Sequence, residues 1–318
     1  MSDTAPLRSI REALARLPHV RRHADRPLRA ERLAGMTNRT YRLQLDGRML
    51  FLRIPGNGAG ALVDRESERH NLAQAIACGI APEILDFDVE HGLLLAPYRE
   101  RALTLTPALL QARPALCREV AHTLRRLHES DIAFRGRLDP FASLRRYEAR
   151  LRALGGRLPP LAAELEGALL PLEAALAKLA PPLRPCHNDP VCENFLLEDG
   201  RVWLVDFEYS GMNDPLWDVA DLIVEADLGQ DLQEKLLEAY FGRTPDPCER
   251  ARLTAYMLLC DLLWGVWAFL ELAAEAVCAV DLRSYGLRRL ARAAERLRAP
   301  ATARVLAPLL QSGELRAR

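Results

Sequence analysis

The sequence predicts an α+β fold of two lobes, a small mixed β-sheet lobe over residues 1–97 and a larger, mainly helical lobe over residues 98–318. Three observations favour this fold. The chain has 318 residues, more than one small core usually organises. Short apolar runs separated by turn residues fill residues 33–98. Helical patterns dominate from Thr104 onward.

The N-terminal lobe is expected to contain a β-hairpin, a helix and two more strands. The runs YRLQL and MLFLRI lie on either side of Asp46-Gly47, a dipeptide that is typical of a two-residue hairpin turn. The segment DRESERHNLAQAIACGI has helical spacing and ends at Gly79, before Pro82. EILDFD and GLLLAPY then predict the two strands that lead into the connection between the lobes.

The C-terminal lobe is predicted to be helical, with one exception. Residues 141–180 are rich in Ala and Leu and are broken by Gly155-Gly156 and Pro159-Pro160, which predicts an inserted helical hairpin. The exception is FLLEDGRVWLVDF, where two apolar runs around Asp199-Gly200 predict a second β-hairpin. The cleft between the two lobes is the expected place for a ligand.

Composition argues against several classes of protein. The 43 basic and 43 acidic residues cancel, so no net field attracts nucleic acid or an anionic membrane. The N-terminus lacks the apolar region of a secretory signal, and acidic residues interrupt the most apolar stretch, AYMLLCDLLWGVWAFLELAAEAV, which predicts a buried helix. The seven cysteines include no CxxC pair, which favours a reducing compartment. We therefore expect a cytoplasmic protein without a membrane span; nothing here indicates its oligomeric state.

A group of oxygen ligands is predicted around the second hairpin. Asn194 begins its first strand and Asp206 ends its second, so both side chains are expected at one end of the hairpin. Amide and carboxylate oxygens suit Mg²⁺, and Glu208 is placed to help with a second ion. Asp189 precedes Asn194 with the spacing of a catalytic loop in which Asp orients or deprotonates a hydroxyl. This pattern predicts phosphoryl transfer from ATP with Mg²⁺.

Two other interpretations use residues of the same segment. Asp and Asn are common in turns because of local hydrogen bonding, so HNDPVCEN alone could be an ordinary turn. Cys186, His187 and Cys192 suggest zinc, but a second ligand pair at zinc-finger spacing is missing. The agreement between the motif, the predicted hairpin and the following DFE favours the catalytic interpretation.

The motifs HNDPVCEN and DFE resemble those of the choline/ethanolamine kinase and aminoglycoside phosphotransferase superfamily, which shares the protein-kinase-like fold. The resemblance spans about residues 33–285. It implies that Asp189 is the catalytic base and that Asn194 and Asp206 bind magnesium, with assistance from Glu208. It also implies that ATP and Mg²⁺ are the cofactors.

The nucleotide is expected to bind mainly to the N-terminal lobe. LAGMTNRTYRL is similar to the family's phosphate-covering turn, in which Gly35, Thr37 and Asn38 offer N–H groups and short polar side chains to phosphate oxygens. On its own GMTN is also typical of an ordinary turn. Pro97 and Tyr98, in the connection between the lobes, are expected to contact the nucleotide as well.

Arg53 in FLRIPG occupies the place where protein kinases have a lysine. Its planar fork can hold phosphate oxygens bidentately if an acidic residue on the next helix orients it. Glu68 is the expected partner and Glu66 the alternative. Because all but two of the 43 basic residues are arginines, Arg53 could also be an ordinary solvated strand residue.

The phosphate acceptor is expected to be a small cationic amino alcohol. Trp264 and Trp267 in WGVW share one helical face, which by itself is also typical of core packing. Choline and ethanolamine kinases have a similar segment whose tryptophans surround the ammonium, together with a tyrosine and an acidic residue. The resemblance assigns these two roles to Tyr285 and Glu225. A second tyrosine that the family often has is missing from ADLGQDLQ, so the cage is expected to be more open.

Three functions remain open from the sequence. The leading hypothesis is a choline or ethanolamine kinase. The second is a kinase of the same fold that acts on thiamine, an amino sugar or an aminoglycoside. The third is a catalytically silent binding module, against which the complete set of Asp189, Asn194 and Asp206 argues. Asp218 and Asp221 in DPLWDVADL are assigned structural roles, with Asp218 bracing the catalytic loop.

Overall fold

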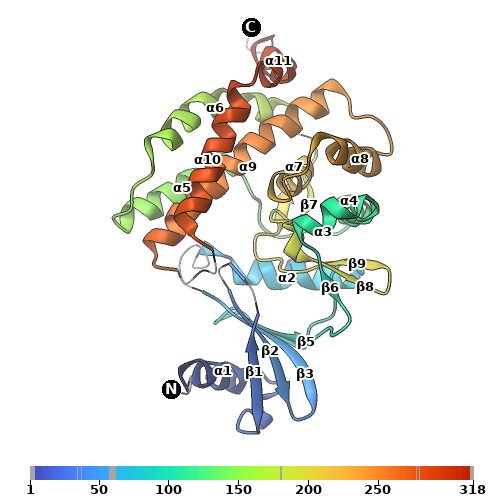
Figure 1. Ribbon diagram of the computed structural model, residues 1–318, viewed down its shortest axis with the longest axis vertical. Helices are drawn as coiled ribbons and strands as arrows, with labels where there is room; N and C mark the ends of the chain where they lie inside the picture. Colours follow the sequence, from blue (N-terminus) through green and yellow to red (C-terminus); the bar gives the residue numbers. More distant parts are fainter. Residues whose placement is uncertain are drawn as a thin grey trace.

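A computed structural model describes residues 4–33, 35–36, 38–56, 62–179, 181–276, 278 and 280–315 of the chain. A β-sheet with an N-terminal helix forms one end of the molecule, and an assembly of helices forms the other (Figure 1). The predicted α+β architecture is confirmed.

The main sheet has the strand order β1-β2-β3-β5-β4. Its strands are β1 (Leu28–Arg32), β2 (Arg39–Leu45), β3 (Arg48–Ile54), β4 (Asp86–Asp88) and β5 (Leu93–Pro97). Every pairing between these strands is antiparallel, which corrects the expectation of a mixed sheet. The physical reason is that β5 turns back after β4 and inserts next to β3, so β3 and β4 never become parallel neighbours.

The β2–β3 hairpin predicted at Asp46-Gly47 is confirmed. The two turn residues have positive φ angles of 51° and 76°, as a type I′ turn requires. Leu43 and Leu45 of β2 are buried and pack with α1 (Thr4–Arg16) in a hydrophobic cluster of their own. The sheet therefore has a small core of its own.

Helix α2 (Arg65–Ala77) connects β3 to β4 and joins the sheet to the helices. Its N-cap Asp64 accepts hydrogen bonds from two backbone N–H groups of the first turn. The chain leaves the helix through Gly79 at a φ of 64°, as the sequence predicts. Leu72 and Ala75 belong to the large hydrophobic core of the helical part, so α2 fixes the sheet against that part.

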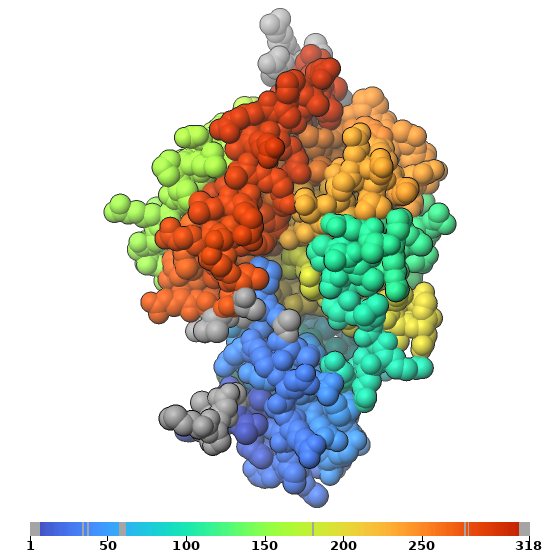
Figure 2. Space-filling view, in the orientation of Figure 1, coloured from blue at the N-terminus to red at the C-terminus, as the bar shows by residue number. Residues whose placement is uncertain are grey.

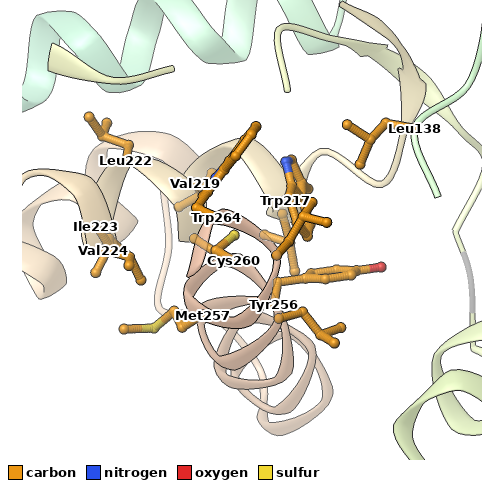
Figure 3. Packing of buried hydrophobic residues seen from close by; sticks show 14 of the residues in the cluster. Leu138, Trp217, Val219, Leu222, Ile223, Val224, Tyr256, Met257, Cys260 and Trp264 are labelled. Carbon is orange, nitrogen blue, oxygen red and sulfur yellow. The ribbon is translucent and has the colours of Figure 1, made fainter. Parts of the chain in front are cut away.

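The helical part is organised around α9. Its helices are α3 (Pro107–Ala112), α4 (Pro114–His128), α5 (Pro140–Ala153), α6 (Pro160–Lys178), α7 (Leu216–Glu225), α8 (Gln230–Phe241), α9 (Pro247–Ala273), α10 (Leu282–Arg298) and α11 (Pro300–Leu315). Helices α5, α6, α7, α10 and α11 all pack against α9. Figure 3 shows the packing of α7 on α9, where the rings of Trp217 and Tyr256 meet with centroids 6.0 Å apart.

Helix α9 contains the most apolar stretch of the sequence. Its length and hydropathy would also suit a membrane span, but 94% of its most apolar window is buried inside the structure. It is a core helix, as its interruption by acidic residues predicts. Helices α5 and α6 occupy the predicted insertion, and both pack against α9 as part of the same core.

Five short strands complete the structure. They are β6 (Leu103–Thr104), β7 (Arg184–Cys186), β8 (Phe195–Glu198), β9 (Arg201–Leu204) and β10 (Gly211–Asn213). The second predicted hairpin is β8–β9, whose turn residues Asp199 and Gly200 have φ angles of 49° and 79°. This hairpin carries the candidate site on its open end.

Candidate active site

Two predicted metal ligands lie side by side at the open end of the β8–β9 hairpin. The N–H of Val205 donates to the carbonyl oxygen of Asn194 at 2.9 Å, and Asp206 follows directly. The amide nitrogen of Asn194 donates to the backbone carbonyl of Asp189 at 2.9 Å. This bond leaves the amide oxygen of Asn194 as the atom that can ligate a cation. In Figure 2 this yellow part of the chain is recessed between the blue sheet and the orange and red helices.

Asp218 holds the loop that precedes Asp189. Its carboxylate, fully buried at the start of α7, accepts hydrogen bonds from the backbone N–H groups of His187 at 2.7 Å and Asn188 at 2.8 Å. It also contacts Nε2 of His128 at 2.9 Å. These contacts agree with the bracing role that the sequence analysis assigns to Asp218.

The structure does not support the zinc alternative. Among the described residues, the group with metal-ligand spacing is His128, Cys186 and Asp218, without His187 or Cys192. The oxygens of Asp218 already accept the hydrogen bonds of the loop. Burial raises the pKa of the Cys186 thiol well above its ordinary value, which disfavours the thiolate that zinc needs.

Arg53 connects the sheet to the hairpin. Its guanidinium group lies 2.6 Å from Glu68 Oε1 and 2.8 Å from Asp206 Oδ1, and only 3% of the side chain is exposed. It is therefore not a solvated strand residue. The acidic partner on α2 is Glu68, which is fully buried, whereas Glu66 pairs with Arg69 at the surface.

Glu208 lies in a cluster of charged side chains that includes an arginine the sequence analysis missed. Arg65 Nη1 lies 3.2 Å from Glu208 Oε2 and 2.6 Å from Glu68 Oε2. Burial, and then repulsion from Asp206, raise the pKa of Glu208 to about 7, although Arg53 and Arg65 act in the opposite direction. The signal that could have identified Arg65 is its position three residues before Glu68, on the same face of a helix.

Asp189 lies beside these carboxylates with most of its surface buried. Burial raises its pKa well above the ordinary value, and the charges of Asp221, Asp206 and Glu208 raise it further. Mutual repulsion among carboxylates, together with the amide oxygen of Asn194, is the environment that a hard divalent cation stabilises. The residues present therefore fit Mg²⁺.

The predicted phosphate-covering turn lies at the same end of the sheet as Arg53. Thr40 pairs with Arg53 across β2 and β3, and the turn directly precedes this point of β2. A Cβ atom at Gly35 would lie 3.0 Å from the carbonyl oxygen of Asn38, so a side chain here would crowd the close turn. Asn38 is buried, and Thr37 lies outside the described residues.

Pro97 and Tyr98 lie further along the same sheet. Pro97 pairs with Leu50 of β3, three residues before Arg53, which corresponds to about 10 Å along the strand. The N–H of Tyr98 donates to the carbonyl oxygen of Met49 at 3.0 Å. These residues and Arg53 therefore mark the two ends of the paired region of β3 and β5, inside the sheet.

Four aromatic rings form a continuous cluster beside the loop. Trp264 and Trp267 meet edge to face at 6.1 Å, and Trp267 meets Tyr285 at 6.2 Å. Tyr209, which the sequence analysis missed, extends the cluster with its ring 5.6 Å from Trp264. Its position directly after DFE is the signal that could have identified it. Both tryptophans are nearly buried, as core packing would also require.

The predicted acidic residue of the acceptor site, Glu225, already has partners. The hydroxyl of Tyr285 donates to Glu225 Oε1 at 3.3 Å, and the guanidinium of Arg289 pairs with the same carboxylate. Asp221 Oδ1 accepts a hydrogen bond from Trp264 Nε1 at 2.7 Å. The sequence analysis missed Arg289, although its position four residues after Tyr285 places both on one face of α10.

Comparison with known proteins identifies the family. The model of the phosphotransferase enzyme family matches residues 28–253, which include the hairpin, the loop and the turn described above. The chain belongs to the phosphotransferase enzyme family. This membership makes it a small-molecule kinase and confirms the resemblance inferred from HNDPVCEN and DFE.

Relatives of this phosphotransferase include both choline and ethanolamine kinases. A choline/ethanolamine kinase family protein from Mesorhizobium loti is 35% identical, with a TM-score of 0.81 over 96% of this chain and 99% of that one. The choline kinase LicA from Streptococcus pneumoniae is 30% identical, with a TM-score of 0.72 over 85% of this chain and 93% of that one. The protein LicA of Haemophilus influenzae is 33% identical over 74% of this chain and 71% of its own length.

The fold of this phosphotransferase is also that of more distant enzymes. An aminoglycoside phosphotransferase is 18% identical, with a TM-score of 0.62 over 93% of this chain and 99% of that one. This likeness supports the predicted protein-kinase-like fold.

Proposed function

We propose that this phosphotransferase transfers the terminal phosphate of ATP to the hydroxyl of choline or ethanolamine, in the presence of Mg²⁺. The observation that carries the proposal is that the carboxylate cluster and the aromatic cluster meet at Asp189. Burial raises the pKa of Tyr209 and Tyr285 well above the ordinary value, and the nearby charge of Asp189 adds to both shifts. The names of the choline and ethanolamine kinases among its relatives support the same acceptor class.

Asn194, Asp206 and Glu208 are the residues that would hold magnesium. When bound, Mg²⁺ neutralises phosphate charge during phosphoryl transfer. The chain itself keeps these ligands in place, since Asp206 contacts Arg53 and Glu208 contacts Arg65. A cation there also relieves the repulsion that raises the pKa of Glu208.

Asp189 would orient the acceptor hydroxyl and accept its proton. Asp218 fixes the backbone immediately before it, so the carboxylate is held where a hydroxyl can approach from the aromatic cluster. The raised pKa of Asp189 makes its carboxylate a stronger base than an ordinary aspartate.

The nucleotide would lie along β3 and β5 of the sheet. Arg53, oriented by Glu68, would hold phosphate oxygens, with the turn at Gly35 and Asn38 above them. The base would reach Pro97 and Tyr98, about 10 Å further along the strands. The relative solved in complex with AMP, 28% identical with a TM-score of 0.73, supports nucleotide use.

The ammonium group of the acceptor would bind to the aromatic cluster. Trp264, Trp267 and Tyr285 offer ring faces, and a desolvated cation over such faces gains about 2 kcal/mol. Glu225 adds a negative charge at the edge of this cluster.

The free cysteines of the described chain suit the cytoplasm, where we place the reaction.

The test is ADP release by the purified protein with ATP and Mg²⁺. Choline, ethanolamine, thiamine and an aminoglycoside are supplied separately, and Asp189→Asn serves as the blank. We expect turnover with choline or ethanolamine and a loss of about 10²-fold to 10⁴-fold in kcat for Asp189→Asn. Turnover with only thiamine or only the aminoglycoside would support kinase activity. It would also indicate that Trp264 and Trp267 are core residues rather than part of an ammonium site. Failure with every acceptor would favour the silent binding module.

A further inference from the structure

Arg289 places a buried positive charge inside the proposed acceptor site. Its side chain on α10 is 4% exposed, and it pairs with Glu225 and, at 2.9 Å, with Asp261 Oδ1. It donates to the hydroxyl of Tyr285 at 2.7 Å, and its guanidinium carbon lies 5.0 Å from the centre of that ring. Burial and the nearby charge of Arg292 lower the pKa of Arg289 to about 9. This arginine therefore uses the same carboxylate and the same ring that an acceptor cation would use.

The other carboxylates near the aromatic cluster are also engaged. Asp261 binds three guanidinium groups, those of Arg289, Arg292 and Arg296. Asp221 offers one oxygen to Trp264 Nε1, and its second oxygen is buried without a hydrogen-bond partner among the described residues. Glu225 and Asp261 are thus already paired with guanidinium groups, whereas Asp221 keeps one oxygen unpaired within the described part of the chain.

The two kinds of ammonium group need different surroundings. A primary ammonium carries three N–H donors and requires acceptors to replace its water. A quaternary ammonium has no N–H donor and is stabilised by aromatic faces and diffuse negative charge. Arg289 occupies hydrogen-bond acceptors that a primary ammonium would need. It does not disturb the contacts among the rings of Trp264, Trp267 and Tyr285.

We propose that Arg289 is a positioning residue that makes the acceptor site favour N-methylated over primary ammonium groups, by holding Glu225 and Tyr285. The inference rests on the proposed function and names the preferred acceptor within it. Arg289 acts through Glu225 and Tyr285, so it determines specificity without touching the reacting atoms.

Arg292 provides a matched control on the same helix. Like Arg289, it binds Asp261, here at 2.6 Å. Its other ion pair is with the exposed Asp227 at 3.6 Å. Its described contacts include neither Glu225 nor the hydroxyl of Tyr285. A role of Arg289 limited to fixing α10 on α9 would therefore be shared by Arg292.

The experiment compares kcat/KM for choline with kcat/KM for ethanolamine in each full-length variant. The ratio of the two values does not depend on the fraction of enzyme that is folded or on effects common to both acceptors. We expect Arg289→Met to shift the ratio about tenfold toward ethanolamine, the size of one charged hydrogen bond gained by the primary ammonium. Arg292→Met is expected to leave the ratio unchanged.

Two further variants protect the test against a folding failure of Arg289→Met. Arg289→Lys keeps the charge, but its compact ammonium cannot serve Glu225, Asp261 and Tyr285 together, so we expect a smaller shift in the same direction. In a Glu225→Gln background, Arg289→Met is expected to shift the ratio little further, because the two residues act as a pair.

The outcomes separate this inference from the proposed function. Wild-type turnover of both acceptors with an unchanged ratio in Arg289→Met and Arg289→Lys overturns the role of Arg289 alone. An equal shift in Arg292→Met overturns it as well, because the effect would then belong to helix packing. A wild-type enzyme that uses neither acceptor overturns the proposed function, and the inference with it.

Discussion

Asp221 is a carboxylic acid buried completely in α7, and its ionisation affects the stability of the folded protein. Burial, and to a smaller extent Asp218, raise its pKa to about 7, although Arg289 and the N–H of Trp264 act in the opposite direction. The folded protein therefore binds this proton more tightly than the unfolded chain does. The resulting stability is fully present below the ordinary pKa of about 4 and is lost as the pH rises through about 7.

Asp221→Asn should weaken this pH dependence. The amide oxygen can still accept from Trp264, while the charge disappears. We expect the variant to be more stable than the wild type at pH values near 8, by at most about 4 kcal/mol, and similar to it only at pH values below about 4. Urea unfolding across this range measures the difference. The exposed Asp227→Asn is the control, and a wild-type slope in Asp221→Asn would contradict the assignment.

The three arginines of the candidate site differ in how well they could be predicted from the sequence. Arg53 could be predicted because it occupies the place where protein kinases have a lysine, before a helix with two candidate partners, Glu68 and Glu66. Arg65 and Arg289 were missed, because almost every basic residue of this chain is an arginine and only their places on the helical faces of Glu68 and Tyr285 distinguish them. Their partners lie as far away in sequence as Glu208 and Glu225, so only the folded structure brings them together.

At the scale of elements, local sequence patterns predicted the two hairpins correctly. They did not predict how strands that are distant in the sequence pair in the sheet. Both Asp-Gly hairpins form as predicted because two adjacent residues fix the turn. The sheet was expected to be mixed, and it is antiparallel because β5 pairs with β3 across the whole of α2 and β4. Pairing between distant strands depends on packing that no short sequence pattern contains.

The crossing of α9 and α10 depends on two glycines. A Cβ atom at Gly286 would lie 2.9 Å from Phe269 Cε2 and 3.1 Å from the carbonyl oxygen of Gly265. The second of these is backbone and cannot move independently of its helix. We expect Gly286→Ala to lower the free energy of unfolding by about 1–3 kcal/mol, measured by urea denaturation.

Gly167 is the matched control for this substitution. It lies inside α6 with no atom within 4 Å of an added Cβ. Gly167→Ala should raise the free energy of unfolding by up to about 1 kcal/mol, because alanine loses less entropy in a helix. Equal effects of the two substitutions would show that the glycines do not set the distance between α9 and α10.

For the whole molecule, two ion pairs join the sheet and its helix α2 to the segment at the end of the hairpin that carries the site. Arg53 of β3 binds Asp206, and Arg65 of α2 binds Glu208. Residues assigned to the nucleotide lie on the sheet, and those assigned to magnesium lie on the hairpin. A magnesium nucleotide would therefore contact both parts at once, and its binding should stabilise the molecule as a unit.

This linkage can be measured by thermal unfolding with and without Mg²⁺ and ADP. A nucleotide present at about 100 times its dissociation constant adds about 2.7 kcal/mol to the stability of the folded wild type. Asp206→Asn should lose most of this increment, because an amide replaces a charged metal ligand. Asp199→Asn is the control. Asp199 lies in the turn of the same hairpin and, like Asp206 with a φ of 65°, has a positive φ of 49°, but it is exposed. If Asp206→Asn keeps the stabilisation by Mg²⁺ and ADP, Asp206 is not a metal ligand. If both variants lose this stabilisation, the substitutions have damaged the hairpin itself.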